Sequence, residues 1–214
     1  GELQAVIDAL GPGHCMIRLI ITRGDGPLNI CWEGCHHPKR ILIGSTIKPL
    51  DDALYQNGVE VCFSPIQKGV MATEKGSIKS GHNLAHVLAM NAARKRGYHE
   101  AVLVNHSGNI AECSTSNIFW IKHQHLHTPE LQSGVLKGVT RQGVIQVAQD
   151  LGIPIIEGRF PMATLLQADE VFITSTTRNV LPVSKVEEQV YPVGPVTRRI
   201  MDAFSKLTSL DLDF

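Results

Sequence analysis

Two stretches of this sequence decide its fold: Ser77-Ile-Lys-Ser-Gly-His-Asn-Leu84 and, further along, Ile110-Ala-Glu-Cys-Ser-Thr-Ser-Asn-Ile-Phe119. In the first, Lys79 lies between an apolar residue and a Ser-Gly turn, so its amine emerges where an extended segment ends and a helix begins. An amine placed in this way is suited to forming a Schiff base with a carbonyl compound. In the second, Glu112 closes a short apolar run and is followed by small hydroxyl residues. We expect Glu112 to face a pocket and to pair there with a protonated ring nitrogen.

Two later segments have the features of anion sites. Leu136-Lys-Gly-Val-Thr140 opens a predicted helix, and the amides at a helix N-terminus have no acceptor within the helix and sit at the positive end of its dipole. Ile173-Thr-Ser-Thr-Thr177 places several hydroxyl groups at the exit of a predicted strand. Each segment taken alone is better explained by a helix cap and a polar turn. Together with the lysine and the carboxylate, they predict a site for a phosphorylated cofactor.

With these features the sequence resembles the fold-type IV, pyridoxal-phosphate-dependent enzymes of the class IV aminotransferase family. That family includes branched-chain and D-amino acid aminotransferases and aminodeoxychorismate lyase. The resemblance runs from about Lys79 to Val183 and is weaker towards both ends of the chain. The matching segments, in family order, are Ile78-Lys-Ser, Glu100-Ala-Val-Leu-Val-Asn105, Ala111-Glu-Cys-Ser-Thr-Ser-Asn-Ile-Phe119, Thr128-Pro129, Gly134-Val-Leu-Lys-Gly-Val-Thr-Arg141, Ala168-Asp-Glu-Val-Phe-Ile-Thr174 and Leu181-Pro-Val183.

The resemblance implies the cofactor pyridoxal 5'-phosphate and the residues that hold it. These are Lys79 for the internal aldimine, Glu112 for the pyridine nitrogen, Leu136 for the ring face, and Val139, Thr140 and Thr177 for the phosphate, with Thr176 as their neighbour. Family members usually begin with a strand-rich segment that supplies an active-site aromatic residue and a phosphate-binding arginine. This sequence shows no counterpart of that arginine. We therefore expect either a part of a longer protein or a short form that lacks part of the site.

The resemblance leaves the reaction open between transamination and a lyase reaction. Branched-chain members usually place a tyrosine five positions after the lysine, where this chain has Leu84. Asn117-Ile-Phe-Trp120 and Leu166-Gln-Ala-Asp-Glu170 are similar to aminodeoxychorismate lyase, whereas Thr174-Ser-Thr-Thr177 and Gly24-Asp-Gly26 are closer to aminotransferases. The leading interpretation is an aminotransferase that moves an amino group between an amino acid and a 2-keto acid. The lyase and a catalytically degenerate scaffold subunit are the alternatives.

The composition agrees with a cytoplasmic enzyme that acts on small-molecule substrates. The chain has 214 residues, 43% of them hydrophobic, and its 20 basic and 20 acidic residues balance to zero net charge. No long run of one charge favours nucleic acid or a membrane surface, and no apolar stretch approaches the roughly 20 residues that span a bilayer. The N-terminus has no basic start typical of a signal peptide. From the family resemblance and from the apolar segment Ile17 to Ile21, which must be covered, we expect a homodimer.

The cysteines and clustered histidines are expected to be structural, not metal ligands. Five cysteines, an odd number, indicate a reducing compartment without required disulfides. Zinc sites usually show tighter paired spacing than the two candidate clusters do. These clusters are Cys31 and Cys35 with His36 and His37, and the alternate histidines 123, 125 and 127, for which a hairpin is the simpler interpretation. Cys113 is interpreted as a packing residue.

Periodicity and chain breakers predict an α+β protein of two domains, with the fold of D-amino acid aminotransferase implied by the resemblance. Residues 1–68 are expected to form a small α+β domain, 69–78 an interdomain linker, and 79–214 the large cofactor-binding domain. The predicted strands span 14–22, 40–47, 59–66, 101–104, 117–121, 153–157 and 171–174. The predicted helices follow a cap at Asp51 and span 83–96, 139–151, 161–167 and 195–207.

Overall fold

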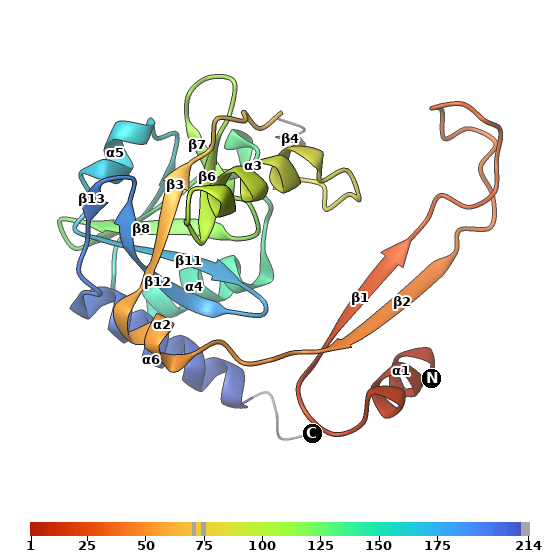
Figure 1. Cartoon of the computed structure of the whole chain (residues 1–214), viewed down its shortest axis with the longest axis horizontal. Coiled ribbons are helices and arrows are strands. Elements are labelled where there is room, and N and C mark those ends of the chain that lie inside the picture. The colour runs from red at the N-terminus through yellow and green to blue at the C-terminus, as the bar shows by residue number, and fades with distance from the viewer. Residues whose placement is uncertain (70–71, 74–75, 211–214) are drawn as a thin grey trace. The chain divides into compact units, whose positions relative to one another are not determined.

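The computed structural model describes residues 1–69, 72–73 and 76–210 (Figure 1). Its contacts divide the chain into two units, Gly1–Leu50 and Asp51–Phe214. This division lies before the boundary expected at residue 68, because strand β3 (Val59–Phe63) pairs in parallel with two strands of the large sheet. Pairing between segments so distant in sequence leaves no local signal. Residues 70, 71, 74 and 75 of the expected linker lie outside the described residues.

The first unit is a helix packed on a two-stranded hairpin. Helix α1 (Glu2–Leu10) lies against β2 (Arg40–Thr46), which pairs antiparallel with β1 (Cys15–Ile21). Gly44 of β2 makes this approach possible, since a Cβ there would come within 2.7 Å of Leu10 Cδ1 and of a methyl group of Val6. The strands expected at 14–22 and 40–47 are confirmed.

The second unit is built on a nine-stranded mixed sheet. The strands run in the order β10-β9-β8-β11-β12-β3-β6-β7, and β13 pairs with β12. Besides β3 they are β6 (Glu100–Val104), β7 (Ile110–Cys113), β8 (Asn117–Lys122), β9 (His125–Pro129), β10 (Ile155–Gly158), β11 (Glu170–Ser175), β12 (Asn179–Val186) and β13 (Gln189–Val190). A separate small ladder joins β4 (Ala72–Thr73) to β5 (Gly76–Ser77).

The connection between β7 and β8 requires the large sheet to curl. The two strands lie five positions apart in the sheet, which is about 24 Å on a flat sheet. Only Ser114, Thr115 and Ser116 connect them, and such a link reaches at most about 14 Å. The sheet therefore bends into a half-barrel, and the backbone bond from Cys113 N to Ser116 O (2.8 Å) lies in the link where β7 approaches β8.

Helices pack on this sheet and form two separate hydrophobic cores with it. Helices α4 and α6 pack on β8 and β11, where the rings of Phe119 and Phe172 stack at 5.2 Å. Helix α3 packs on β3 and β6 through two buried alanines, Ala89 and Ala93. The helices of this unit are α2 (Asp52–Asn57), α3 (Leu84–Lys95), α4 (Val139–Asp150), α5 (Met162–Leu166) and α6 (Pro195–Leu210), with a 3-10 turn at Leu131–Ser133.

Most elements with a local sequence signal form where they are expected. Asp51 caps α2 by accepting a hydrogen bond from Ala53 N at 2.9 Å. The histidine-rich segment is a hairpin, because β8 and β9 pair antiparallel around His123 and Gln124, both with positive φ. Strand β12 was not predicted, since Pro182 within it argues against a strand interior. No helix among the described residues is long and apolar enough to cross a membrane.

The contact between α4 and α6 yields a first prediction. Alanine in place of a helical glycine ordinarily stabilises a helix by about 1 kcal/mol. At Gly143, however, the new Cβ would lie 2.8 Å from Cε2 of the buried Phe204 ring, and overpacking of this kind costs about 1 to 3 kcal/mol. We expect Gly143→Ala to lower the free energy of unfolding measured in urea. The control Gln142→Ala, at an exposed position of the same helix, should change it by less than about 0.5 kcal/mol. An unchanged or higher stability of Gly143→Ala would contradict the tight contact.

Candidate active site

Glu112 lies at the centre of the most densely bonded cluster of the predicted site. Its side chain is 9% exposed, and the carboxylate contacts groups on both sides. Oε1 pairs with the ammonium of Lys68 and lies 3.3 Å from His86 Nε2. Oε2 accepts a hydrogen bond from Leu136 N at 2.8 Å. Burial alone would raise the pKa of Glu112, but the His86 contact, the Lys68 charge and the Leu136 amide outweigh it and hold the pKa below its ordinary value.

Asn117 links this carboxylate to the start of α4. Its amide nitrogen donates to Leu136 O at 3.0 Å and lies 3.4 Å from Glu112 Oε2. Gly138, the N-cap residue of α4, packs against the same side chain, since a Cβ at Gly138 would come within 2.3 Å of Asn117 Oδ1. Any larger residue at position 138 would displace Asn117. Glu112, Leu136 and the first turn of α4 are therefore held together by one side chain.

Lys79 lies on a segment that is attached to this cluster at both ends. Before it, Ser77 N donates to Val135 O at 3.1 Å and Ser77 bridges Leu136, whose amide reaches Glu112. After it, α3 carries His86 to the same carboxylate. The Lys79 side chain itself is exposed. The structure thus connects the backbone around Lys79 to the Glu112 cluster, while the Lys79 side chain lies at the surface.

Lys68 is the residue of this cluster that sequence reasoning missed. Its side chain is 7% exposed and forms the ion pair with Glu112, and its backbone nitrogen donates to Val104 O at 2.8 Å. No motif surrounds it, because it lies in an irregular segment after β3. His86 was also missed, although it lies in the first turn of the predicted helix that follows Lys79.

The two predicted anion sites lie at one end of the sheet. Helix α4 begins at Val139, and no side chain within the described part of the chain caps its N-terminus. Val139 is exposed and Thr140 buried. The turn after β11 carries Thr176 and Thr177, both exposed. Thr174, the residue just before this turn, pairs with Asn117 of β8, which contacts Gly138 at the start of α4. The turn after β11 and the start of α4 are therefore linked through Thr174 and Asn117, at the end of the sheet where Glu112 is located.

Neither nearby arginine is free to bind a phosphate. The Arg141 side chain is 1% exposed, pairs with Glu157 and donates to Pro129 O at 3.0 Å. The Arg178 guanidinium pairs with Glu100 at 2.6 Å, and Glu100 is fully buried. Each cation already neutralises a carboxylate, and separating either pair would leave a charge without its partner.

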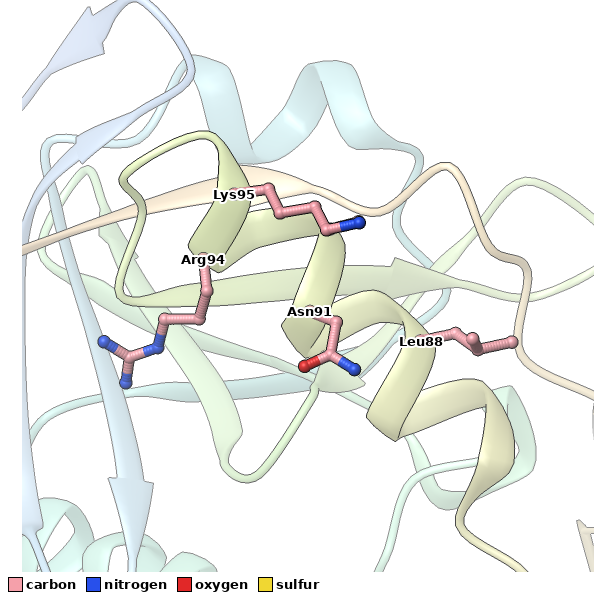
Figure 2. A pocket seen from close by; sticks show the side chains of 5 residues that line it. Leu88, Asn91, Arg94 and Lys95 are labelled. Carbon is pink, nitrogen blue, oxygen red and sulfur yellow. The ribbon is translucent and has the colours of Figure 1, made fainter.

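A surface depression of about 550 Å³ lies elsewhere, on the outer face of α3 (Figure 2). All the residues lining it belong to this one helix, among them Leu88, Asn91 and Lys95. Among the residues that the structure describes, no second element contributes polar groups that converge on it, so it lacks the features of a ligand site.

The fold places the chain in a known structural class. The structure of 4-amino-4-deoxychorismate lyase from Pseudomonas aeruginosa superposes on it with a TM-score of 0.86 at 30% identity, covering all of this chain and 76% of the lyase. A branched-chain aminotransferase from Thermoproteus uzoniensis, solved with norvaline, matches with a TM-score of 0.85 at 26% identity over 99% of this chain and 72% of that one. The architecture is that of the fold-type IV enzymes.

The chain belongs to the amino-transferase class IV family, whose sequence model matches residues 1–186. It is 31% identical to a putative branched-chain-amino-acid aminotransferase of Methanocaldococcus jannaschii over 89% of this chain. It is 30% identical to aminodeoxychorismate lyase of Bacillus subtilis over 84% of this chain. It spans 66% and 60% of the lengths of these two relatives. One similar branched-chain aminotransferase structure was determined with pyridoxamine 5'-phosphate.

Proposed function

We propose that the chain forms the cofactor-binding part of a pyridoxal-phosphate-dependent aminotransferase that acts on an amino acid and a 2-keto acid. The observation that supports this most strongly is the carboxylate of Glu112, which is buried in an ion pair with Lys68, close to the start of α4 and to the Lys79 segment. The groups present fit the cofactor: Glu112 for the ring nitrogen, Leu136 for the ring face, and the start of α4 with Thr176 and Thr177 for the phosphate. Thr174 Oγ1 adds a buried hydroxyl that has no partner among the described residues.

Bound pyridoxal phosphate supplies an electron sink for the carbanion left when an amino acid loses its alpha proton. In our proposal the protein provides the surrounding groups. Glu112, held ionised, would keep a proton on the ring nitrogen. The Lys79 amine would hold the cofactor and would move the alpha proton. The amides of Val139 and Thr140 and the hydroxyls of Thr176 and Thr177 bind the phosphate anion through neutral donors.

Two lysines are candidates for the covalent link, and borohydride trapping separates them. Lys79 has the family context, whereas Lys68 already contacts Glu112. We expect reduction with borohydride to fix pyridoxal phosphate on the peptide containing Lys79, because the Lys68 ammonium is held in an ion pair and is a poor nucleophile while protonated. The Lys79→Ala variant should lose the adduct and the matched Lys68→Ala variant should retain it. An adduct on Lys68 in the unsubstituted protein would contradict the assignment of Lys79.

The reaction class is tested by product analysis of the full-length protein. We expect transfer of the amino group from an amino acid to a 2-keto acid, detected as a new amino acid and a new keto acid in equal amounts. The aminodeoxychorismate lyase alternative is supported by the TM-score of 0.86 to such a lyase. It predicts 4-aminobenzoate and pyruvate from aminodeoxychorismate instead. A degenerate scaffold subunit would give neither set of products and no borohydride-stable adduct.

A cytoplasmic homodimer is the assembly we propose. Strand β1 exposes Leu19 and Ile21, which are 57% and 66% accessible, and a partner subunit would cover such apolar side chains. Sedimentation equilibrium of the full-length protein at micromolar concentration should therefore give twice the chain mass. Replacing Leu19 and Ile21 together with serine should shift the equilibrium towards the single chain. A monomer in the unsubstituted protein would count against the dimer.

A further inference from the structure

Arg178 lies in the turn that carries two of the proposed phosphate ligands. The turn joins β11 to β12 and is closed by a bond from Arg178 N to Ser175 O at 3.2 Å. Its outermost residues, Thr176 and Thr177, are exposed and are followed by Asn179, which has a positive φ of 52°. Few contacts of its own therefore restrain the tip of this turn, so the position of its hydroxyl groups depends on how its base is anchored.

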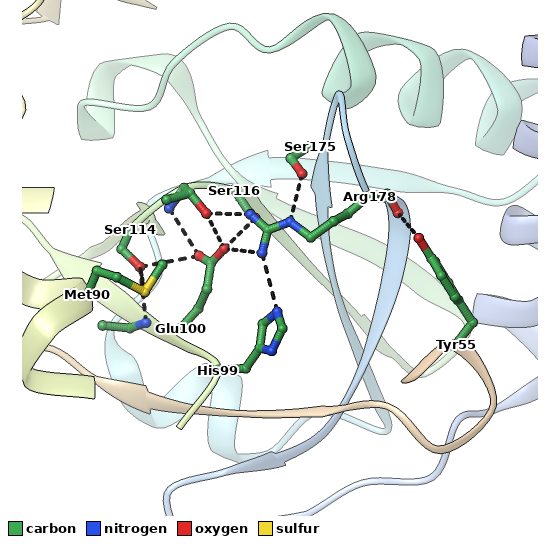
Figure 3. A network of polar contacts seen from close by, with 10 residues as sticks. Tyr55, Met90, His99, Glu100, Ser114, Ser116, Ser175 and Arg178 are labelled. Carbon is green, nitrogen blue, oxygen red and sulfur yellow. Dashed lines mark hydrogen bonds and ion pairs between the residues drawn. The ribbon is translucent and has the colours of Figure 1, made fainter. Parts of the chain in front are cut away.

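The Arg178 side chain anchors the turn to two distant segments (Figure 3). Its Nε donates to Ser175 Oγ at 3.1 Å within the turn, its Nη2 donates to Thr115 Oγ1, and its Nη1 pairs with Glu100 at 2.6 Å. Thr115 belongs to the short link between β7 and β8, and Glu100 begins β6. A planar guanidinium can hold several acceptors in a fixed arrangement, which a lysine ammonium cannot do. The β11–β12 turn is thus fixed to the link between β7 and β8 and to the start of β6.

Glu100 makes this anchor rigid because it bonds every residue of the same link. Its carboxylate accepts from Ser116 Oγ at 2.9 Å, from Thr115 N at 3.1 Å and from Ser114 Oγ at 3.4 Å. The Glu100 side chain is fully buried. A buried carboxylate with this many donors has a well-defined position.

Two further contacts hold Arg178 in place. The backbone oxygen of Arg178 accepts from the Tyr55 hydroxyl at 3.2 Å. The ring nitrogen His99 Nε2 lies 3.5 Å from Arg178 Nη1. Burial and the neighbouring charges of Arg178 and Arg94 lower the pKa of His99, so the imidazole is neutral at pH 7 and accepts from the guanidinium without repelling it.

We propose that Arg178 is a positioning residue for recognition of the cofactor's phosphate: it holds Thr176 and Thr177 opposite the first amides of α4 and does not touch the phosphate itself. This inference rests on the proposed function, because it presumes pyridoxal phosphate at the Glu112 site. The link from the turn to α4 passes through Thr174, Asn117 and Gly138. Because Arg178 is paired with Glu100, phosphate recognition in this turn falls to hydroxyl groups and backbone amides.

The test compares the affinity of pyridoxal phosphate with that of pyridoxal, which lacks the phosphate. Dissociation constants for both are measured by absorbance titration of the full-length protein freed of cofactor. We expect Arg178→Met to raise the dissociation constant of pyridoxal phosphate about tenfold or more, as the loss of a charge-assisted bond implies. The dissociation constant of pyridoxal should change less than about twofold. Arg178→Lys should recover only part of the loss. The control Arg96→Met breaks the ion pair with Glu187, which involves neither the turn nor Glu100, and should leave both constants unchanged.

Glu100→Gln distinguishes a positioning role from direct binding. If Arg178 positions the turn, Glu100→Gln lowers the preference for the phosphorylated compound as Arg178→Met does, and the double variant is no worse than either single one. An unchanged or stronger preference in Glu100→Gln would mean that the released arginine binds phosphate directly, and would overturn the proposal. Equal weakening of both compounds in Arg178→Met would also overturn it.

The double variant also covers the case in which Arg178→Met does not fold, because it removes the buried charge that a single substitution leaves without a partner. The double variant should then prefer pyridoxal phosphate over pyridoxal less strongly than the unsubstituted protein does. An equal preference in the two proteins would overturn the inference. If the unsubstituted protein binds neither compound at Lys79, the proposed function fails, and this inference fails with it. That result is distinct from a protein that binds both compounds and whose preference does not depend on Arg178.

Discussion

The three-residue link between β7 and β8 is the constraint on which the second unit depends. Because β7 and β8 lie five positions apart in the sheet, a link of this length exists only if the sheet curls. The curl brings Glu112, at the end of β7, close to Asn117, at the start of β8, and both then meet Leu136. Glu100 stabilises the link by accepting hydrogen bonds from all three of its residues. The architecture and the candidate site therefore share one structural cause.

The charge of Glu112 follows from competition between burial and bonding. A carboxylate in an apolar site would take up a proton, and it would then be a poor partner for a protonated ring nitrogen. Here the Leu136 amide, His86 and the Lys68 ammonium favour the ionised form and lower the pKa. In this structure the Lys68 ammonium is the counter-charge of the Glu112 carboxylate. The ring nitrogen of the cofactor would approach that same carboxylate. Cys113, the next residue, is fully buried, and burial raises the pKa of its thiol well above the ordinary value, which agrees with a packing role.

The sequence predicts features whose cause is local. The Asp51 cap, the helix that begins after Asn83 and the histidine hairpin each depend on residues a few positions apart, and each forms as expected. What could not be predicted depends on pairing across the chain. Strand β3 joins β6 and β12, far along the sequence, and so belongs to the same unit as the large sheet. Lys68 and Arg178 likewise gain their partners, Glu112 and Glu100, only after the sheet has curled.

Arg141 and Arg178 show why a nearby arginine is not automatically a phosphate ligand. Both lie within a few residues of the predicted anion sites, and sequence proximity alone would make either one a substitute for the arginine that the family usually supplies from an earlier segment. Each is instead paired with a carboxylate, Glu157 or Glu100, and turning towards an anion would leave that carboxylate without its cation. For Glu100, which is fully buried, this cost is a few kcal/mol, comparable to what a phosphate contact would return. Anion binding at this end of the sheet therefore depends, within the described residues, on the amides of α4 and the hydroxyls of the β11–β12 turn, whose position Arg178 sets.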